Sequence, residues 1–213
     1  MISVPSSVVF DDVSWPNRPW FRSNILLDSS GNPAGPDGTS RSLTRGNDRH
    51  LLRALRQDAQ AIVTGGETVR SEGWHFPPDG FLFVATRGDL SLDTCARPER
   101  LRLFTFDASS KSLENALSTL ATECRVRRLL CESGPQLLRA ITEADLIDEA
   151  FVSVVSSDRA TEIHVDELEG VVRRALSLKP SRYALLGHVQ QSDVTYFRFV
   201  HLGPRLSPVF GAM

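Results

Sequence analysis

The sequence has few cysteines, and none of them is placed to hold a metal. Cys95, Cys124 and Cys131 are scattered, with no Cys-x-x-Cys pair and no histidine at zinc-ligand spacing. We therefore expect no metal site and three buried or half-buried free thiols. The five histidines and the hydroxyl of Ser133 also lie outside the His-Glu-x-x-His and Gly-x-Ser-x-Gly patterns, which disfavours metalloprotease and serine-hydrolase chemistry.

Long apolar runs and a strong net charge are missing as well. No apolar stretch approaches the ~20 residues of a membrane-spanning helix, and the N-terminus lacks the basic and apolar regions of a signal peptide. Lysine is confined to Lys111 and Lys179, so arginine supplies nearly all of the positive charge, and the net charge is only -2. We expect a cytoplasmic protein without a membrane or nucleic-acid partner.

What remains is the composition of one globular domain. The 213 residues, 41% hydrophobic and 23% charged, suffice for a single core and need no second domain. Residues 1–18 contain two prolines and little periodicity. We expect an irregular N-terminal arm over residues 1–18 and one domain over residues 19–213.

Strands and helices alternate along most of this domain. Apolar runs predict strands at residues 20–27, 61–63, 81–86, 101–106, 128–131 and 149–155. Helical patterns predict helices at 48–57, from 68 or 69 onward, at 111–124 and at 134–144; the first begins at Asn47 or Asp48 and has Leu51, Leu52, Leu55 and Ala59 on its apolar side. Residues 183–189 and 194–201 predict an antiparallel hairpin. The order favours an α/β fold, with a mostly parallel central sheet flanked by helices and a C-terminal antiparallel hairpin.

Two glycine-containing turns lie where a predicted strand leads into a predicted helix. In AIVTGGETVRSEG, residues 61–73, Gly65 and Gly66 permit a tight turn, and in CESGP, residues 131–135, Gly134 lies at the corresponding place. Backbone N–H groups at a helix start bind phosphate, and two such turns at one sheet edge can hold a dinucleotide. Neither turn has the Gly-x-Gly-x-x-Gly spacing or the Walker lysine, and a glycine pair between strand and helix is often only an ordinary turn.

Three polar residues near these turns have two interpretations each. Glu132 precedes the second turn and is either an exposed turn residue or a substrate contact. Thr86 and Arg87 end a predicted strand and either form a surface turn or hold the 2'-phosphate that distinguishes NADPH from NADH.

An arginine stripe follows a loop rich in glycine, proline and serine. The stripe consists of Arg45, Arg49, Arg53 and Arg56, at spacings of three or four residues. It is either a solvated helix face or a phosphate or carboxylate site, for which Arg53 is the best candidate. The loop, residues 28–40, is long enough to fold over a ligand.

Five segments keep an order and spacing that are specific as a set. They are RPWFRSNILL with the loop after it, DRHLLRAL, DAQAIVTGGETVRSEG, the strand ending at Thr86 and Arg87, and LLCESGPQLLRAITEADLIDEAFVSVV. From about Arg18 to His201 the chain resembles the dihydrofolate-reductase-like pyrimidine reductases of riboflavin biosynthesis. The last segment, with Glu-x-Gly-Pro before Ala-Asp-Leu-Ile-Asp-Glu, carries the resemblance most strongly.

The resemblance implies a dihydrofolate-reductase-like fold and NADPH-dependent reduction of a ribosylaminopyrimidine phosphate. Hydride would be delivered to the ribose carbon bonded to nitrogen. Glu132 would be the catalytic residue, orienting the ribose or assisting proton transfer. The substrate would contact Asn24, Asp28, Ser40, Arg53 and Glu132. The cofactor would contact Leu27, Gly65, Gly66, Thr68, Glu72, Thr86, Arg87, Ser133, Gly134, Pro135, Gln136 and Leu137.

The resemblance also implies a free-standing reductase that forms a homodimer. The zinc deaminase to which this reductase is often fused has His-x-Glu and Pro-Cys-x-x-Cys motifs, and the sequence contains neither. The final hairpin, with Tyr196, Phe197 and Phe199, would offer apolar edge surface for the dimer.

Three departures from the family pattern leave other functions open. Ser30 stands where the family has an aspartate, Glu67 replaces a small residue in the phosphate turn, and SSDRATEIHV, residues 156–165, lacks the usual proline and glycine. The altered loop favours a pterin, folate or secondary-metabolite substrate. Glu67 and Ser30 favour a non-catalytic member that acts as a binding module, because a carboxylate repels pyrophosphate unless it points away.

Overall fold

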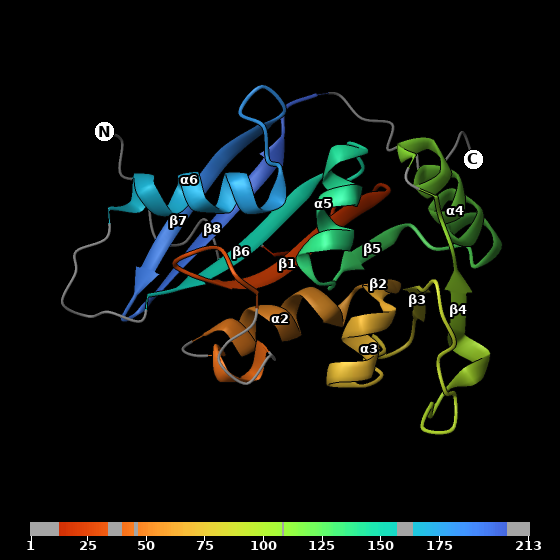
Figure 1. The fold of residues 1–213 in the computed structure, drawn as a ribbon. Helices are drawn as coiled ribbons and strands as arrows, with labels where there is room; N and C mark the ends of the chain where they lie inside the picture. The colour runs from red at the N-terminus through yellow and green to blue at the C-terminus, as the bar shows by residue number, and fades with distance from the viewer. Residues whose placement is uncertain (1–12, 34–39, 45–46, 108, 157–163, 204–213) are drawn as a thin grey trace.

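A single eight-stranded sheet forms the centre of the fold, with helices on both of its faces (Figure 1). The computed structural model describes residues 13–33, 40–44, 47–107, 109–156 and 164–203. In spatial order the strands are β4, β3, β2, β5, β1, β6, β8 and β7. Their bounds are β1 Trp20–Asp28, β2 Ala61–Gly65, β3 Phe81–Ala85, β4 Leu101–Phe104, β5 Arg128–Cys131, β6 Glu149–Val155, β7 Tyr183–Gln191 and β8 Val194–His201.

The sheet is parallel from β4 to β6 and ends in an antiparallel hairpin. β1 pairs in parallel with β5 and β6, β2 with β3 and β5, and β3 with β4. β8 lies antiparallel between β6 and β7, and Ser192 turns the hairpin with a φ of 56°. The predicted α/β class, with a mostly parallel sheet and a C-terminal hairpin, is confirmed.

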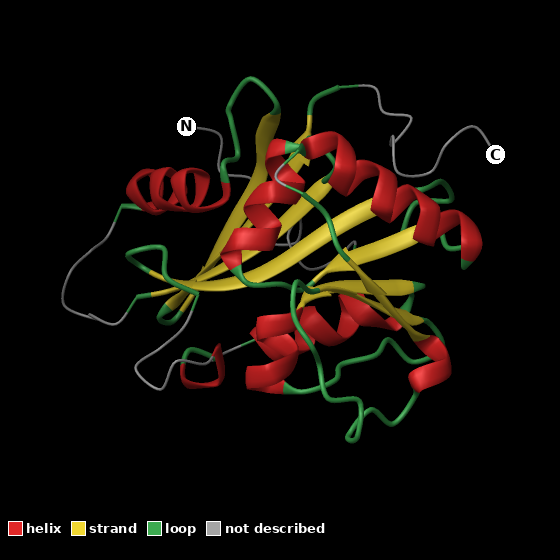
Figure 2. Cartoon of the chain, turned by 45° about the vertical axis from the view of Figure 1, so that its right-hand side comes forward, coloured by secondary structure: helices red, strands yellow, loops and turns green. Residues whose placement is uncertain are grey.

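Helices α4, α5 and α6 cover one face of the sheet, and α2 and α3 cover the other (Figure 2). Alternation along β1 serves both faces: Phe21, Ile25 and Leu27 pack toward α4, α5 and α6, whereas Leu26 packs toward α2 and α3. The helices are α2 Asp48–Gln57, α3 Gly66–Glu72, α4 Ser110–Glu123, α5 Pro135–Glu143 and α6 Val165–Leu176, with short 3-10 turns η1 Ser40–Ser42 and η2 Pro98–Arg100.

Most predicted elements agree with the structure within two residues. Helix α2 has the predicted bounds, and Leu51 and Leu55 face the core one turn apart. Ala59, expected on the same side, is buried just beyond the end of the helix. Leu52 is only half-buried, and Asp48 takes a buried position instead. Predictions for residues 1–12, 34–39, 45–46, 157–163 and 204–213 lie outside the described residues.

Helix α6 was not predicted. Its core contacts come from Leu168, Val172 and Leu176, which are buried at four-residue spacing, and the left-handed Ser177 ends it. Gly170 lies in its middle, and His164 gives no side-chain cap at its start. A weak start and an interior glycine hide the helical signal.

The C-terminal hairpin is not an apolar edge. Tyr196, Phe197 and Phe199 are all fully buried, because β8 is an inner strand and β7 forms the sheet edge. The prediction that these three side chains offer dimerisation surface was wrong. None of the described helices is both long and apolar enough to cross a membrane.

The described part of the N-terminal arm is docked onto a buried charge cluster. The indole of Trp15 donates to the carbonyl of Leu55 on α2, at 3.3 Å, and its ring lies 4.5 Å from the Arg22 guanidinium. Arg22 also donates to two backbone carbonyls of the arm. Glu149 binds both Arg22 and Arg198, at 2.6 Å each. The arm is therefore tied to β1, β6 and α2.

Candidate functional site

The two glycine turns meet at the carboxyl ends of the paired strands β2 and β5. The N–H of Gly134 points to the hydroxyl of Thr68, at 3.4 Å. The N–H of Glu132 donates to the carbonyl of Val63 at 2.9 Å, and the hydroxyl of Thr64 donates to the carbonyl of Glu132 at 2.7 Å. These bonds join two predicted cofactor segments into one sheet edge.

The glycines at this edge serve different purposes. A Cβ on Gly66 would lie 2.9 Å from the Thr86 hydroxyl, so the glycine allows α3 to start against the end of β3. A Cβ on Gly134 would meet nothing within 4 Å, and this N-cap gives α5 no side-chain hydrogen bond. The uncapped start of α5 therefore fits an anion such as a dinucleotide phosphate.

Other predicted cofactor residues contribute unequally to this edge. Gln136 and Arg87 are exposed, whereas Leu27 is fully buried and could meet a ligand only through its backbone. The Ser133 hydroxyl is buried against Cys131, at 3.2 Å, and the hydroxyl of Thr86 closes a local turn with Gly88.

Glu67 does not point into the cofactor edge. Its side chain is 87% exposed and pairs with Arg70 on the next turn of α3, at 3.1 Å. The carboxylate is therefore directed into solvent, where water screens its charge. With its side chain turned away from the glycine turn, Glu67 is compatible with a phosphate bound at that turn.

Glu132 is held by Arg56 from helix α2. The guanidinium Nε donates to both carboxylate oxygens, at 2.8 and 3.0 Å, and a terminal nitrogen forms a further short bond to Oε2. Burial alone would lower the pKa of Arg56, but the hydrogen bonds and charge of Glu132, with the charge of Glu72, outweigh it and raise that pKa. The carboxylate is thus fixed in place and matched by one cation.

Ser40 and Glu72, predicted to contact substrate and cofactor respectively, are bonded to each other. The hydroxyl of Ser40 donates to Oε1 of Glu72 at 2.6 Å, and its backbone N–H lies 3.4 Å from the same oxygen. The bond ties η1 to the last turn of α3. Because the charge of Glu72 also acts on Arg56, these residues and Glu132 form one electrostatic group.

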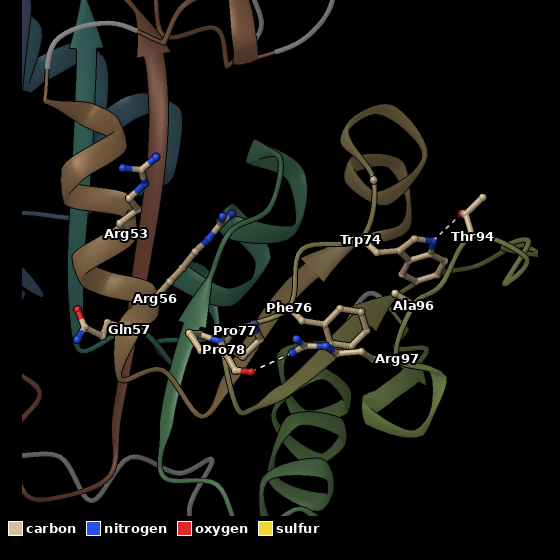
Figure 3. Close-up of a pocket in the computed structure, with 11 residues that line it drawn as sticks. Arg53, Arg56, Gln57, Trp74, Phe76, Pro77, Pro78, Thr94, Ala96 and Arg97 are labelled. Atoms are coloured by element: carbon tan, nitrogen blue, oxygen red, sulfur yellow. Dashed lines mark hydrogen bonds between the residues drawn. The ribbon is translucent and has the colours of Figure 1, made fainter.

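Arg53 lies one turn before Arg56 and borders a cavity of about 770 Å³ (Figure 3). Arg49 is exposed on the same helix, and Arg45 lies outside the described residues. Both Arg53 and Arg56 line this cavity, but Arg56 is also paired with Glu132. The cavity is lined by Arg53, Arg56, Gln57, Gly73, Trp74, Phe76, Pro77, Pro78, Thr94, Ala96 and Arg97.

Two predicted substrate residues lie on β1, and they differ in how they are engaged. Asp28 accepts hydrogen bonds from its own loop, from the backbone of Ser30 and from the backbone and side chain of Asn32, at 2.8 to 3.0 Å. Partial burial raises the pKa of Asp28, but these bonds outweigh it and lower the pKa overall. Oδ1 of Asn24 is buried and has no hydrogen-bond partner within the described residues, which suits a residue that faces a ligand.

A buried carboxylate at the start of α2 was missed. Asp48 was predicted only as a possible helix cap, but Asn47 holds the cap position, without a capping side-chain bond. Asp48 instead accepts a hydrogen bond from the Ser153 hydroxyl on β6, at 2.7 Å, and is 5% exposed. Burial raises the pKa of Asp48, against the lowering effects of Ser153 and Arg49. Its partner lies far away in sequence, so the helix pattern could not show it.

The cysteines and acidic residues form no metal centre in the described chain. Cys131 is buried, and Cys95 and Cys124 are half-buried; all three are free, as predicted. Burial raises the pKa of Cys131 to about 12, so this thiol is unreactive at neutral pH. Among the described residues, no group of three or more His, Cys, Asp or Glu side chains is placed to hold a metal ion.

Comparison with known proteins identifies the fold. No family model matches the sequence, and no curated protein matches it. Among solved structures, RibD of Acinetobacter baumannii is similar with a TM-score of 0.63 and 18% identity, over 87% of this chain and 59% of that chain. The chain therefore spans about three fifths of the length of that RibD.

Two other solved structures match over nearly their whole length. A pyrimidine reductase-like protein from Corynebacterium diphtheriae has a TM-score of 0.63 and 16% identity, over 93% of this chain and 99% of that chain. A dihydrofolate reductase from Enterococcus faecalis, complexed with NADP(H), has a TM-score of 0.53 and 11% identity, over 86% of this chain and 97% of that chain. The resemblance is thus confirmed at the level of the fold: the chain has the fold shared by the riboflavin-pathway reductases and dihydrofolate reductase.

Proposed function

We propose that the chain is an NADPH-dependent reductase, with a ribosylaminopyrimidine phosphate of the riboflavin-biosynthesis type as its first candidate substrate. The observation that carries the proposal is the position of the Glu132–Arg56 pair beside the uncapped glycine turn of α5. A reductase of this kind must hold a dinucleotide and a second molecule together, and this edge offers a place for each.

The backbone at Gly134 and the turn at Gly65 and Gly66 would hold the phosphates of the cofactor. NADPH supplies a hydride when it is bound there. The exposed Arg87 would contact the 2'-phosphate, as a bidentate or single charge-assisted hydrogen bond. The paired and exposed Glu67 removes one of the two arguments for a non-catalytic member.

Glu132 would act on the substrate as a fixed hydrogen-bond acceptor. With the sugar ring open, the ribose carbon and the nitrogen form a C=N bond; the carbon gains the hydride and the nitrogen gains a proton, which water can supply. Arg56 fixes the carboxylate of Glu132 and leaves a lone pair on Oε1, which can orient a ribose hydroxyl or the N–H of the substrate. Asn24, with its unpartnered Oδ1, would contact the substrate on the same face of the sheet.

A pterin-like or folate-like substrate is the second candidate. The aromatic and proline residues along the cavity beside Arg53 are the observation that supports it. A homodimer also stays a proposal, and it would need a surface other than the buried face of β8.

Turnover measurements test the reductase proposal. Purified protein is mixed with NADPH and each substrate class, and the loss of NADPH absorbance is followed. Glu132→Gln should lower kcat by roughly a hundredfold, whereas Glu123→Gln, at an exposed position on α4, should leave it unchanged. Equal turnover by Glu132→Gln and the unmodified protein would refute the assigned role. Complementation of a riboflavin auxotroph separates the first candidate substrate from the second.

A further inference from the structure

The N-terminal arm meets helix α2 at the turn that carries Arg56. Leu55, the residue before Arg56, has its carbonyl in the last turn of this helix. In a longer helix the N–H of Ala59 would bond to that carbonyl, but it donates to the carbonyl of Arg56 instead, at 3.2 Å. The indole N–H of Trp15 donates to the Leu55 carbonyl at 3.3 Å. The arm therefore supplies a hydrogen bond to a carbonyl that the end of the helix passes over.

One buried arginine holds the arm against the sheet. The side chain of Arg22 on β1 is 2% exposed, and its two terminal nitrogens donate to the carbonyls of Val13 and Ser14, at 2.7 and 2.8 Å. Its Nε donates to Glu149 at 2.6 Å, and its guanidinium carbon lies 4.5 Å from the centre of the Trp15 ring. Three consecutive arm residues thus contact one fixed guanidinium, which places the indole against the end of α2.

The pair of Arg56 and Glu132 depends on where this last turn lies. The Arg56 side chain extends away from the helix (Figure 3), and its Nε lies 2.8 and 3.0 Å from the two oxygens of Glu132. Hydrogen bonds of this kind span about 2.7 to 3.2 Å, so a displacement of the turn by about 1 Å would break them. The start of α2 is anchored separately, because the Ser153 hydroxyl donates to Asp48 at 2.7 Å. The arm acts at the opposite end, beside the proposed reaction centre.

We propose that Trp15 is a positioning residue for this centre: by holding the last turn of α2, it keeps Arg56 where it fixes the Glu132 carboxylate. The inference rests on the proposed function only for the part that Glu132 plays in the reaction. The positioning itself belongs to the folded protein and can be measured without substrate or cofactor. The competing explanation is the burial of the Leu55 side chain, which would hold the same turn without the arm.

Exchange of the Arg56 Nε–H with water, followed by NMR on isotope-labelled protein, tests the positioning. Because this N–H donates to Glu132, it exchanges when the pair opens. Trp15→Phe keeps a ring beside Arg22 but removes the indole N–H. It should speed up the exchange about fivefold, the factor that corresponds to the net contribution of one hydrogen bond. The signal is assigned by its loss in Arg56→Met.

Two controls separate positioning from a general loss of stability. The Nε–H of Arg173 donates to Glu169 at 2.6 Å on α6, on the other face of the sheet, and its exchange should be unchanged in Trp15→Phe. Trp20→Phe removes an indole N–H that donates to the buried charge cluster instead of to α2, and it should leave the Arg56 exchange unchanged. Trp15→Ala, which also removes the ring, should speed up that exchange at least as much as Trp15→Phe. Folding of each variant is checked by its thermal melt.

Turnover by the same variants links the positioning to the reaction. With a substrate that the protein reduces, Trp15→Phe should lower kcat about fivefold, because the same free energy is lost, and should leave the Kd for NADPH unchanged. Faster Arg56 exchange in a protein that reduces no substrate would support the positioning and refute the reductase. Turnover with unchanged Arg56 exchange would support the reductase and refute the positioning.

Three results would overturn the inference. Arg56 exchange that stays unchanged in both Trp15 variants would show that the buried Leu55 holds the turn alone. Equal acceleration at Arg173 would show a general loss of stability. An equal effect of Trp20→Phe would assign the acceleration to the charge cluster and not to the bond between the arm and α2.

Discussion

Replacing Arg56 by Met should destabilise the fold by about 2 kcal/mol. The pair with Glu132 is intermediate in burial, with the Arg56 side chain 26% and the Glu132 side chain 11% exposed. Exposed ion pairs contribute about 0 to 1 kcal/mol, and removing one partner of a fully buried pair costs about 3 to 5 kcal/mol. Methionine keeps the apolar stem of the side chain but leaves the carboxylate half-buried and without its cation.

Urea denaturation of a double-mutant cycle measures this cost. The cycle consists of Arg56→Met, Glu132→Gln and the double variant, followed by circular dichroism. In a thermal melt, Arg56→Met should lower Tm by about 4 to 8 °C. In urea, the coupling energy between the two sites should reach about 1 kcal/mol or more. The double variant should be less destabilised than the two single losses added together.

The exposed pair between Arg70 and Glu67 is the matched control, with side chains 50% and 87% exposed. Arg70→Met should cost less than about 0.5 kcal/mol. If Arg56→Met costs no more than Arg70→Met, or if the coupling energy is zero within error, Arg56 does not hold Glu132 in solution and the proposed site geometry is refuted.

Four further substitutions probe the backbone and the buried charges. Gly66→Ala should destabilise by about 1 to 3 kcal/mol, because its Cβ would lie 2.9 Å from a neighbouring hydroxyl, while Gly134→Ala should melt like the unmodified protein; equal melts would refute the close approach. Burial raises the pKa of Asp48, so the ionised carboxylate destabilises the folded state, and this cost sets in as the pH rises above 3.8. Asp48→Asn should therefore have a higher Tm than the unmodified protein at neutral pH and lose this advantage below pH 3.8. A Tm equal to that of the unmodified protein at both pH values would contradict the burial effect. Glu149→Gln should cost about 3 to 5 kcal/mol, since it leaves two buried guanidiniums without their carboxylate; a loss below about 1 kcal/mol in urea denaturation would show that the cluster is hydrated.

Local pattern was enough to predict most of the fold. Leu51 and Leu55 recur at the helical period within α2, and alternating strand and helix signals predict the parallel sheet. Helix α6 was not predicted, because an interior glycine and a start without a side-chain cap weaken its helical pattern in the sequence. The burial of Tyr196 depends on β8 lying between two other strands, which no local pattern contains.

The site was predictable only in part, because its decisive contacts join distant residues. Glycine turns can be found from neighbours in sequence, and the structure brings both to one edge. Within the arginine stripe, Arg53 and Arg56 look equivalent; what separates them is Glu132, which is 76 positions from Arg56. Asp48 likewise depends on Ser153, 105 positions away. Such pairings follow from strand order, not from spacing.

Titration of the purified protein with NADPH tests the central claim most directly. We expect a Kd in the roughly micromolar to sub-millimolar range, and about tenfold weaker binding to Gly134→Ala with an unchanged melt, because its Cβ would occupy the open space over the start of α5. A folded protein that binds neither NADPH nor NADH at millimolar concentration would contradict the reductase proposal.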